Sequence, residues 1–149
     1  MVNSKMSSFD RMRVNPARSV LSRETANAIR FCIEHYPDKF NHEDLTTAVF
    51  IEHIGKWYEI MNNRKLSLAF SKKRPEEYDK YLDWLIHFME FFSSTKLHSS
   101  QKENALKPTQ KGVLLTTMSI LMIQKDLLLP ENGFEFVLTA RFSNDCIGK

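Results

Sequence analysis

The chain has 149 residues, of which 42% are hydrophobic and 26% are charged. This composition is typical of a globular domain with a buried core and excludes an intrinsically disordered chain. Two cysteines exclude a disulfide scaffold, and the net charge of +3 is compatible with an acidic partner without demonstrating one. The first residues lack an apolar signal segment, and residues 113–123 are too short and too polar to span a bilayer. We therefore expect an intracellular protein, nuclear or cytoplasmic, without a membrane partner.

The elements expected along the chain are helical. Four glycines and five prolines are too few for a turn-rich β-sandwich, so the sequence predicts an all-α, compact domain of four to six helices with a short extended segment near the C-terminus. Residues 1–11 are expected to form a loose tail, and residues 12–149 the domain. A first helix is expected from Asn15 to Pro37. Its predicted apolar face comprises Val20, Leu21, Ala28, Phe31 and Cys32.

The next two helices have clear boundaries in the sequence. A second helix is expected to begin after Asn41 and to end at Asn62, with apolar residues around more than half of its circumference. A basic loop follows, and Pro75 is suited to the first turn of a third helix. That helix carries the clearest amphipathic stripe of the sequence, which consists of Tyr78, Tyr81, Leu82, Leu85, Phe88, Met89 and Phe92.

The last third of the chain is less regular. Residues 93–107 are rich in Ser, Lys and Asn and predict a loop. A fourth helix is expected over 109–128, and because apolar residues surround it, it should be the central and most buried element. Residues 134–138 fit a short strand or another helical turn. Ser143 or Asn144 is suited to cap a further helix, so the chain is expected to be a fragment that stops within a larger fold.

The sequence lacks the motifs of several common sites. It has no phosphate-binding loop of the G-x-x-x-x-G-K-[ST] type, and its five histidines lack zinc-site spacing. No residue pattern indicates a catalytic nucleophile with its base. The loop between the second and third helices contains five cations, which either bind phosphates of a nucleotide or nucleic acid or belong to a solvated connector: Arg64, Lys65, Lys72, Lys73 and Arg74.

Four segments together resemble the insertion domain of P element-type transposases, the family of THAP-domain transposase-like proteins. Residues 12–31 resemble a block that reads L-S-x-S-V-A-x-A-I/L-x-F, and residues 57–64 resemble W-F-D-x-x-N-S-R. Residues 108–120 resemble a glycine-containing segment that leads into a buried helix. Residues 136–145 resemble Y-L-L-T-x-x-L-x-Q-D-x-x-E. The four blocks stand in the family's order.

The resemblance implies a function. In this family a helical insertion interrupts an RNase H-like catalytic domain and binds GTP, which assists assembly with transposon-end DNA. The chain is then expected to be a non-catalytic fragment or remnant that takes part in transposition as a GTP-binding domain, with Mg²⁺ accompanying the nucleotide. Its partners would be a guanine nucleotide and DNA or other transposase segments. Gly148 stands where the family has a catalytic Glu, so no transposase activity is expected.

The resemblance also implies candidate nucleotide-binding residues. Asn62 and Arg64 match the family motif, and Glu59 replaces its Asp. Asparagine can both donate and accept at a base or ribose, cations suit phosphate oxygens, and an aspartate can accept from the two guanine N–H groups. Polar residues at helix ends are also common where no ligand binds. The candidates are Glu59, Asn62, Asn63, Arg64, Lys65, Lys111, Gly112 and Asp145.

The alternative is a helical protein-interaction or assembly module without nucleotide binding. Trp57, Trp84 and Phe91 are its candidate anchors, because aromatic side chains dominate interface energetics. The same residues also fit an ordinary core.

Overall fold

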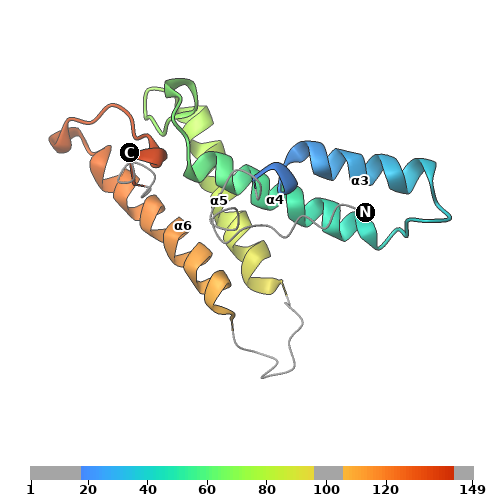
Figure 1. The fold of residues 1–149 in the computed structure, drawn as a ribbon. Helices are drawn as coiled ribbons and strands as arrows, with labels where there is room; N and C mark the ends of the chain where they lie inside the picture. Colours follow the sequence, from blue (N-terminus) through green and yellow to red (C-terminus); the bar gives the residue numbers. More distant parts are fainter. Residues whose placement is uncertain (1–17, 96–105, 143–149) are drawn as a thin grey trace, which may run out of the picture. The chain divides into compact units, whose positions relative to one another are not determined.

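The computed structural model describes residues 18–95 and 106–142, and these residues form an all-α protein, as predicted (Figure 1). No strand occurs within the described residues, and none of their helices is long and apolar enough to cross a membrane. The chain divides into two compact units, with the boundary after Tyr58. The helices are α3 (Arg23–His35), α4 (Asp44–Met61), α5 (Pro75–Ser94) and α6 (Pro108–Leu127), and the 3-10 turns are η1 (Leu66–Leu68), η2 (Pro130–Asn132) and η3 (Thr139–Phe142).

In the first unit, α3 begins later than predicted. The backbone breaks at Leu21 and Ser22, and the side chain of Ser22 caps the helix by accepting a hydrogen bond of 3.3 Å from the Thr25 backbone N–H. A serine that caps the helix in this way has an extended backbone, so the helix does not continue through this position. The predicted start at Asn15 lies outside the described residues.

The contact between α3 and α4 is made by small residues. A Cβ added to Gly55 on α4 would lie 2.8 Å from the carbonyl oxygen of Leu21, so a larger residue does not fit there. Ala26 is fully buried in the same unit. The predicted apolar face of α3 is right for Leu21, which packs against the buried cluster, and wrong for Phe31, which is 53% exposed. The prediction also missed Ala26. The buried cluster is Ala26, Ala48 and Ile51, with Leu21 and Ile29 packed against it.

The second unit is built on an antiparallel pair of helices, α5 and α6 (Figure 1). A glutamine of α6 joins the helices at each end. Near the start of α6, Gln110 donates to the carbonyl of Thr95 at 2.8 Å, just after the end of α5. Near its other end, Gln124 accepts a hydrogen bond of 2.8 Å from the Tyr78 hydroxyl. These buried amides fix the pairing of the two helices.

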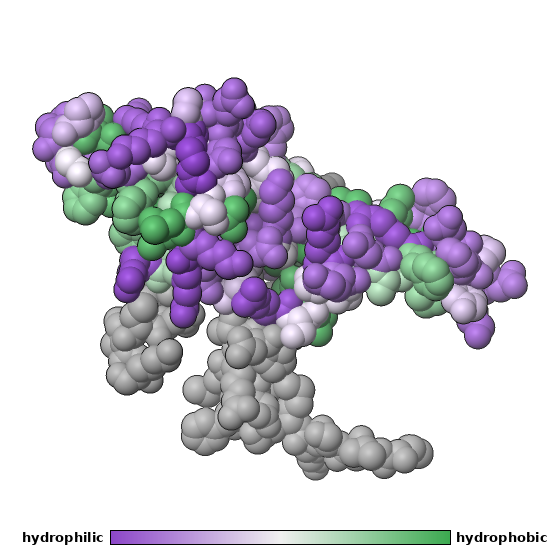
Figure 2. Space-filling model, turned by 90° about the horizontal axis from the view of Figure 1, so that it is seen from above, coloured by the Kyte–Doolittle hydropathy of each residue, from purple (hydrophilic) through white to green (hydrophobic). Residues whose placement is uncertain are grey.

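The two helices differ in how well the sequence predicted their buried faces. On α5, Leu85, Phe88 and Phe92 are buried, as the amphipathic stripe predicted. The prediction that α6 is the most buried element is wrong, because its inner face is largely polar and apolar side chains point outward. On the face that Figure 2 draws, apolar patches lie among hydrophilic side chains. The buried residues of α6 are Gln110, Thr117, Ile120 and Gln124, and its most exposed apolar residues are Leu115, Met118 and Met122.

The segment between α4 and α5 pairs with the segment that follows α6. Phe70 and Val137 form an isolated antiparallel bridge, with N–H···O distances of 3.1 and 2.8 Å. The Ser71 hydroxyl donates to the carbonyl of Glu135 at 2.7 Å. Residues 134–138 thus form neither a strand nor a helical turn, because only Val137 among them pairs through its backbone, with Phe70. The predicted caps at Ser143 and Asn144 lie outside the described residues.

Candidate functional site

The end of α4 is joined to the turn η3 through Asn63 and Thr139. The backbone N–H of Asn63 donates to the Thr139 hydroxyl at 3.0 Å, and this hydroxyl donates to the carbonyl of Ile60 at 2.5 Å. The N–H of Ala140 in turn donates to the carbonyl of Asn63 at 3.2 Å. Thr139 is 1% exposed and Asn63 is 6% exposed, so these hydrogen bonds are shielded from water. The junction therefore holds two distant parts of the sequence in one arrangement.

The side chain of Asn63 also shapes the loop that follows. Its Oδ1 accepts from the Lys65 N–H at 2.8 Å, and its Nδ2 donates to the Lys65 carbonyl at 3.2 Å. This is the local turn that asparagine forms after a helix. Both ends of the amide are engaged within the protein, so Asn63 positions its neighbours Arg64 and Lys65.

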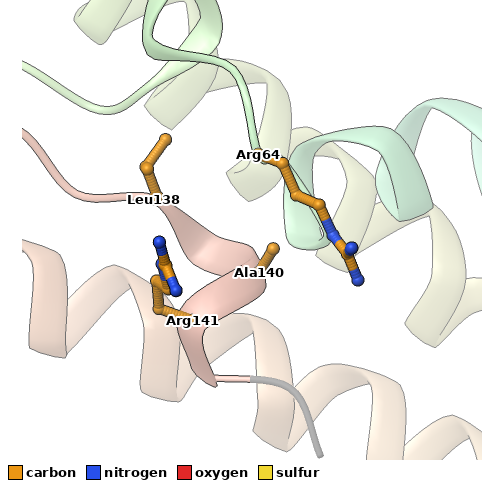
Figure 3. A pocket seen from close by; sticks show the side chains of 4 residues that line it. All are labelled: Arg64, Leu138, Ala140 and Arg141. Atoms are coloured by element: carbon orange, nitrogen blue, oxygen red, sulfur yellow. The ribbon is translucent and has the colours of Figure 1, made fainter. Parts of the chain in front are cut away.

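A hollow of about 180 Å³ lies at this junction. Its lining residues come from both sides of the junction: Arg64 follows Asn63, whereas Leu138, Ala140 and Arg141 belong to the second segment. Figure 3 shows Ala140 between the side chains of the two arginines. Two arginines are among the residues that line this hollow, and arginine can donate paired hydrogen bonds to phosphate or carboxylate oxygens.

The structure places the candidate residues in three groups. Glu59 is exposed in the last turns of α4, and Asn62 is half-buried. Arg64 and Lys65 are exposed, and Arg64 lines the hollow.

Lys111 and Gly112 are exposed near the start of α6, the end that pairs with the end of α5. At 1.5 Å per residue, Lys111 lies roughly 20 Å along the helix from Gln124. The structure therefore does not bring Lys111 and Gly112 together with the Asn63 junction. Asp145 lies outside the described residues.

The basic loop has a partly structural role. The Arg74 guanidinium donates to the carbonyls of Leu66 at 2.8 Å and Ala69 at 3.0 Å, and it also donates to the carbonyl of Ser67. Arg74 therefore holds the turn η1 closed. Lys73 forms an ion pair of 2.6 Å with Glu135, although both side chains are largely exposed. Lys73 and Arg74, which belong to the five cations predicted to bind phosphates or to solvate a connector, are thus engaged within the protein.

The aromatic side chains beneath this loop pack closely. Phe70 makes an edge contact with Tyr81 at a centroid distance of 5.9 Å. Burial raises the pKa of the Tyr81 phenol, so this group stays neutral at physiological pH. Within residues 18–95 and 106–142, no three side chains of the metal-binding types gather into a cluster.

Sequence reasoning did not single out two residues of the junction, Thr139 and Arg141. Thr139 stands at the threonine of the family's Y-L-L-T motif, so a signal was present in the sequence. The reason for a threonine becomes visible only when Asn63, 76 positions away, lies beside it. Arg141 stands at a variable position of that motif, and only the hollow distinguishes it.

Comparisons with known proteins agree with this architecture. Residues 2–75, about half of the chain, match the sequence profile of the family described as TNP-like, GTP-binding insertion domain. No curated protein matches the chain. A solved structure, the Drosophila P element transposase strand transfer complex, is similar with a TM-score of 0.72 and 24% sequence identity. The likeness covers 95% of this chain and 31% of that chain, so this chain spans about a third of the transposase's length.

The two findings carry different conclusions. At 24% identity, the likeness to the Drosophila structure shows a shared fold. The sequence profile describes an insertion domain rather than a catalytic segment, and it confirms the family indicated by the four sequence blocks. The chain therefore belongs to the TNP-like, GTP-binding insertion domain family of transposase-derived proteins.

Proposed function

We propose that the chain binds a guanine nucleotide where the end of α4 meets the segment 138–141. The observation that carries the proposal is the hollow between Arg64 and Arg141, which the buried hydrogen bonds of Asn63 and Thr139 hold in place. Arg64 and Arg141 both belong to the lining of this hollow, and arginine side chains pair well with phosphate oxygens. The family's description as GTP-binding supports the choice of nucleotide.

The candidate residues take different roles in this proposal. Arg64 and Lys65 contact phosphate oxygens, and Asn63 holds both of them in place through its side-chain turn. Glu59 and Asn62 face the ribose or the base. Asp145, four residues after Arg141, accepts from the guanine N–H groups. Mg²⁺ arrives with the nucleotide, coordinated by phosphate oxygens.

Lys111 and Gly112 make a separate part of the proposal. They contribute to the same site only if the nucleotide reaches the far end of α6, because they lie near the end of α5. We expect Lys111→Gln to leave GTP affinity unchanged, and a weakening as large as that of Arg64→Gln would extend the site to this end.

Isothermal titration of the full chain with GTP and ATP, in the presence of Mg²⁺, tests the proposal. We expect GTP to bind more tightly than ATP, and Arg64→Gln or Lys65→Gln to weaken GTP by about tenfold or more, as expected for one charge-assisted hydrogen bond. Lys72→Gln is the matched control, because it removes the same charge from an exposed position of the same loop. The absence of GTP binding at millimolar concentration would overturn the proposal, and equal losses in all three variants would show general electrostatics instead of a site.

The proposed role is binding without catalysis. The chain contributes an insertion domain, and Gly148 stands where the catalytic glutamate of the resembled family is expected. DNA is a further partner in this proposal, since exposed cations of the loop can contact phosphates. A gel-shift titration with duplex DNA at increasing salt tests it, because phosphate contacts lose affinity steeply as the salt concentration rises.

A second function, protein assembly without nucleotide binding, is favoured by the outer face of α6. Leu115, Met118 and Met122 are each more than half exposed and follow one another at helical spacing. The predicted anchors Trp57, Trp84 and Phe91 are half-buried, which makes them weaker candidates for this role. Light scattering over a concentration series tests self-association. A stable oligomer that Met118→Glu dissociates would favour this function, and a monomer at all concentrations would dismiss self-association.

A further inference from the structure

The segment 64–68 has the residue pattern of a kinase substrate. It reads Arg-Lys-Leu-Ser-Leu, with an arginine three positions before Ser67, a lysine two positions before it and a hydrophobic residue directly after it. Serine kinases with acidic side chains in the substrate groove select such serines, because the two cations pair with carboxylates of the enzyme. Ser67 is the only serine or threonine of the 149 residues that has an arginine three positions before it.

The Ser67 hydroxyl is accessible in the folded chain. All of residues 64–68 are exposed, whereas Asn63 before them and Ala69 after them are buried. Within residues 18–95 and 106–142, no atom hydrogen-bonds to the hydroxyl, and Arg74 contacts Ser67 through its backbone carbonyl. The segment that carries the cations and the serine therefore faces solvent as one surface.

The neighbouring serine of the same loop, Ser71, provides a contrast. It is 6% exposed, and its hydroxyl donates to the carbonyl of Glu135 at 2.7 Å. The same oxygen accepts from the backbone N–H of Lys73 at 3.3 Å. Of these two serines, four positions apart, the fold thus presents one to an enzyme and engages the other.

A kinase binds its substrate in an extended form, and the turn η1 can open to that form at small cost. The turn holds two backbone hydrogen bonds, from the N–H of Leu68 at 3.1 Å and from the N–H of Ala69 at 3.2 Å. The backbone of Lys65 and Ala69, on either side of the turn, is already extended. Leu66 and Leu68 are each about half exposed, so opening uncovers little apolar surface. Short 3-10 turns on the surface belong to the segments that open locally.

We propose that Ser67 is a phosphorylation site for a serine kinase with an acidic substrate groove. In the reaction, the Ser67 oxygen forms a bond to the γ-phosphorus of ATP, and the bond from that phosphorus to the β–γ bridging oxygen breaks. ADP leaves with the bridging oxygen, and the hydroxyl proton passes to the catalytic aspartate of the kinase. The kinase and its ATP with Mg²⁺ are the co-reactants, and this chain supplies the hydroxyl and the cations that select it.

The modification changes the charge of the loop beside the junction. Phosphoserine carries nearly two negative charges, which here stand three residues after Arg64 and two after Lys65. In the proposed nucleotide site these cations contact the phosphates of GTP, so the phosphoserine competes for them and repels the nucleotide. This effect on GTP rests on the proposed function, whereas the modification itself does not.

The test incubates the folded full chain with ATP, Mg²⁺ and the catalytic subunit of cyclic-AMP-dependent protein kinase, which selects serines preceded by arginine. Trypsin then releases residues 66–72, which contain both serines, and fragmentation in the mass spectrometer assigns the phosphate to one of them. We expect phosphate on Ser67 and none on Ser71. Arg64→Gln should lower kcat/KM by about tenfold or more, and Lys72→Gln, the charge-matched control, should leave it nearly unchanged.

Three outcomes would each overturn the modification site. They are the absence of phosphate on Ser67, phosphate on Ser67 only after heat denaturation of the chain, and equal losses of kcat/KM in Arg64→Gln and Lys72→Gln.

The effect on the nucleotide has its own measurement. Isothermal titration with GTP compares the unmodified chain with the chain phosphorylated at Ser67, and we expect phosphorylation to weaken GTP binding by about tenfold or more. Equal affinities would overturn the effect on GTP and leave the modification site standing. If the unmodified chain binds no GTP, the proposed function and this effect fall together, and the phosphate on Ser67 still decides the modification.

Discussion

The substitution Thr139→Val removes the hydroxyl that joins the end of α4 to η3 with little change of shape. That hydroxyl accepts from the Asn63 N–H at 3.0 Å and donates to the Ile60 carbonyl at 2.5 Å, at a residue that is 1% exposed. The valine leaves two buried polar groups without this partner, and each costs about 1–3 kcal/mol. We therefore expect the free energy of unfolding to fall by about 2–6 kcal/mol. Urea denaturation measures this loss.

Thr139→Ser is the matched control, because it keeps the hydroxyl and removes one methyl group. We expect it to cost about 1 kcal/mol. Hydrogen exchange at the Asn63 amide gives a local reading, since this amide should lose protection in Thr139→Val and keep it in Thr139→Ser. If the valine variant is as stable as the unmodified chain, or the serine variant is the less stable of the two, the hydroxyl does not hold the junction.

Three further substitutions test the helices. Gly55→Ala should destabilise the chain by about 1–3 kcal/mol in urea denaturation, because its Cβ meets the Leu21 carbonyl oxygen at 2.8 Å. Gly112→Ala should stabilise the chain by about 1 kcal/mol, since nothing lies within 4 Å of the added Cβ and alanine favours a helix. A more stable Gly55→Ala variant or a less stable Gly112→Ala variant would contradict the packing described. The Arg30 guanidinium, 2.5 Å from Glu52, lowers the pKa of this carboxyl from its ordinary value of 4.5. The stabilisation is therefore present above that value and lost as the pH falls through the lower folded-state pKa. Glu52→Gln should accordingly lower the free energy of unfolding by less than about 1 kcal/mol at pH 7, and the variant and the unmodified chain should be equally stable at low pH. A difference in stability that grows on acidification would contradict the ion pair.

The sequence predicted those elements whose signals are local. Pro75 with its two following glutamates marked the start of α5, and the stripe that contains Leu85 and Phe88 marked its buried face. Predictions failed where tertiary contacts decide the outcome. Ala26 is buried in a cluster with Ala48 and Ile51 of α4, and Gly55 leaves room for the Leu21 carbonyl just before α3. No pattern within α3 alone contains that information.

The same distinction holds for the site. Arg64 was predicted because it lies in a recognisable motif at the end of a helix. Arg141 lies in a variable position of the motif, and it lines the same hollow as Arg64 because the hydrogen bond between Thr139 and Asn63 joins segments that are 76 positions apart. A long-range contact of this kind leaves no periodicity in a single sequence.

A titration of the ¹⁵N-labelled chain with GTP, followed by amide chemical shifts, tests the central claim most directly. The account predicts that the shifts concentrate in the amides of residues 62–65 and 138–141, and that Arg64→Gln reduces them. An absence of shifts at millimolar GTP, or shifts confined to α3, would contradict a nucleotide site at this junction.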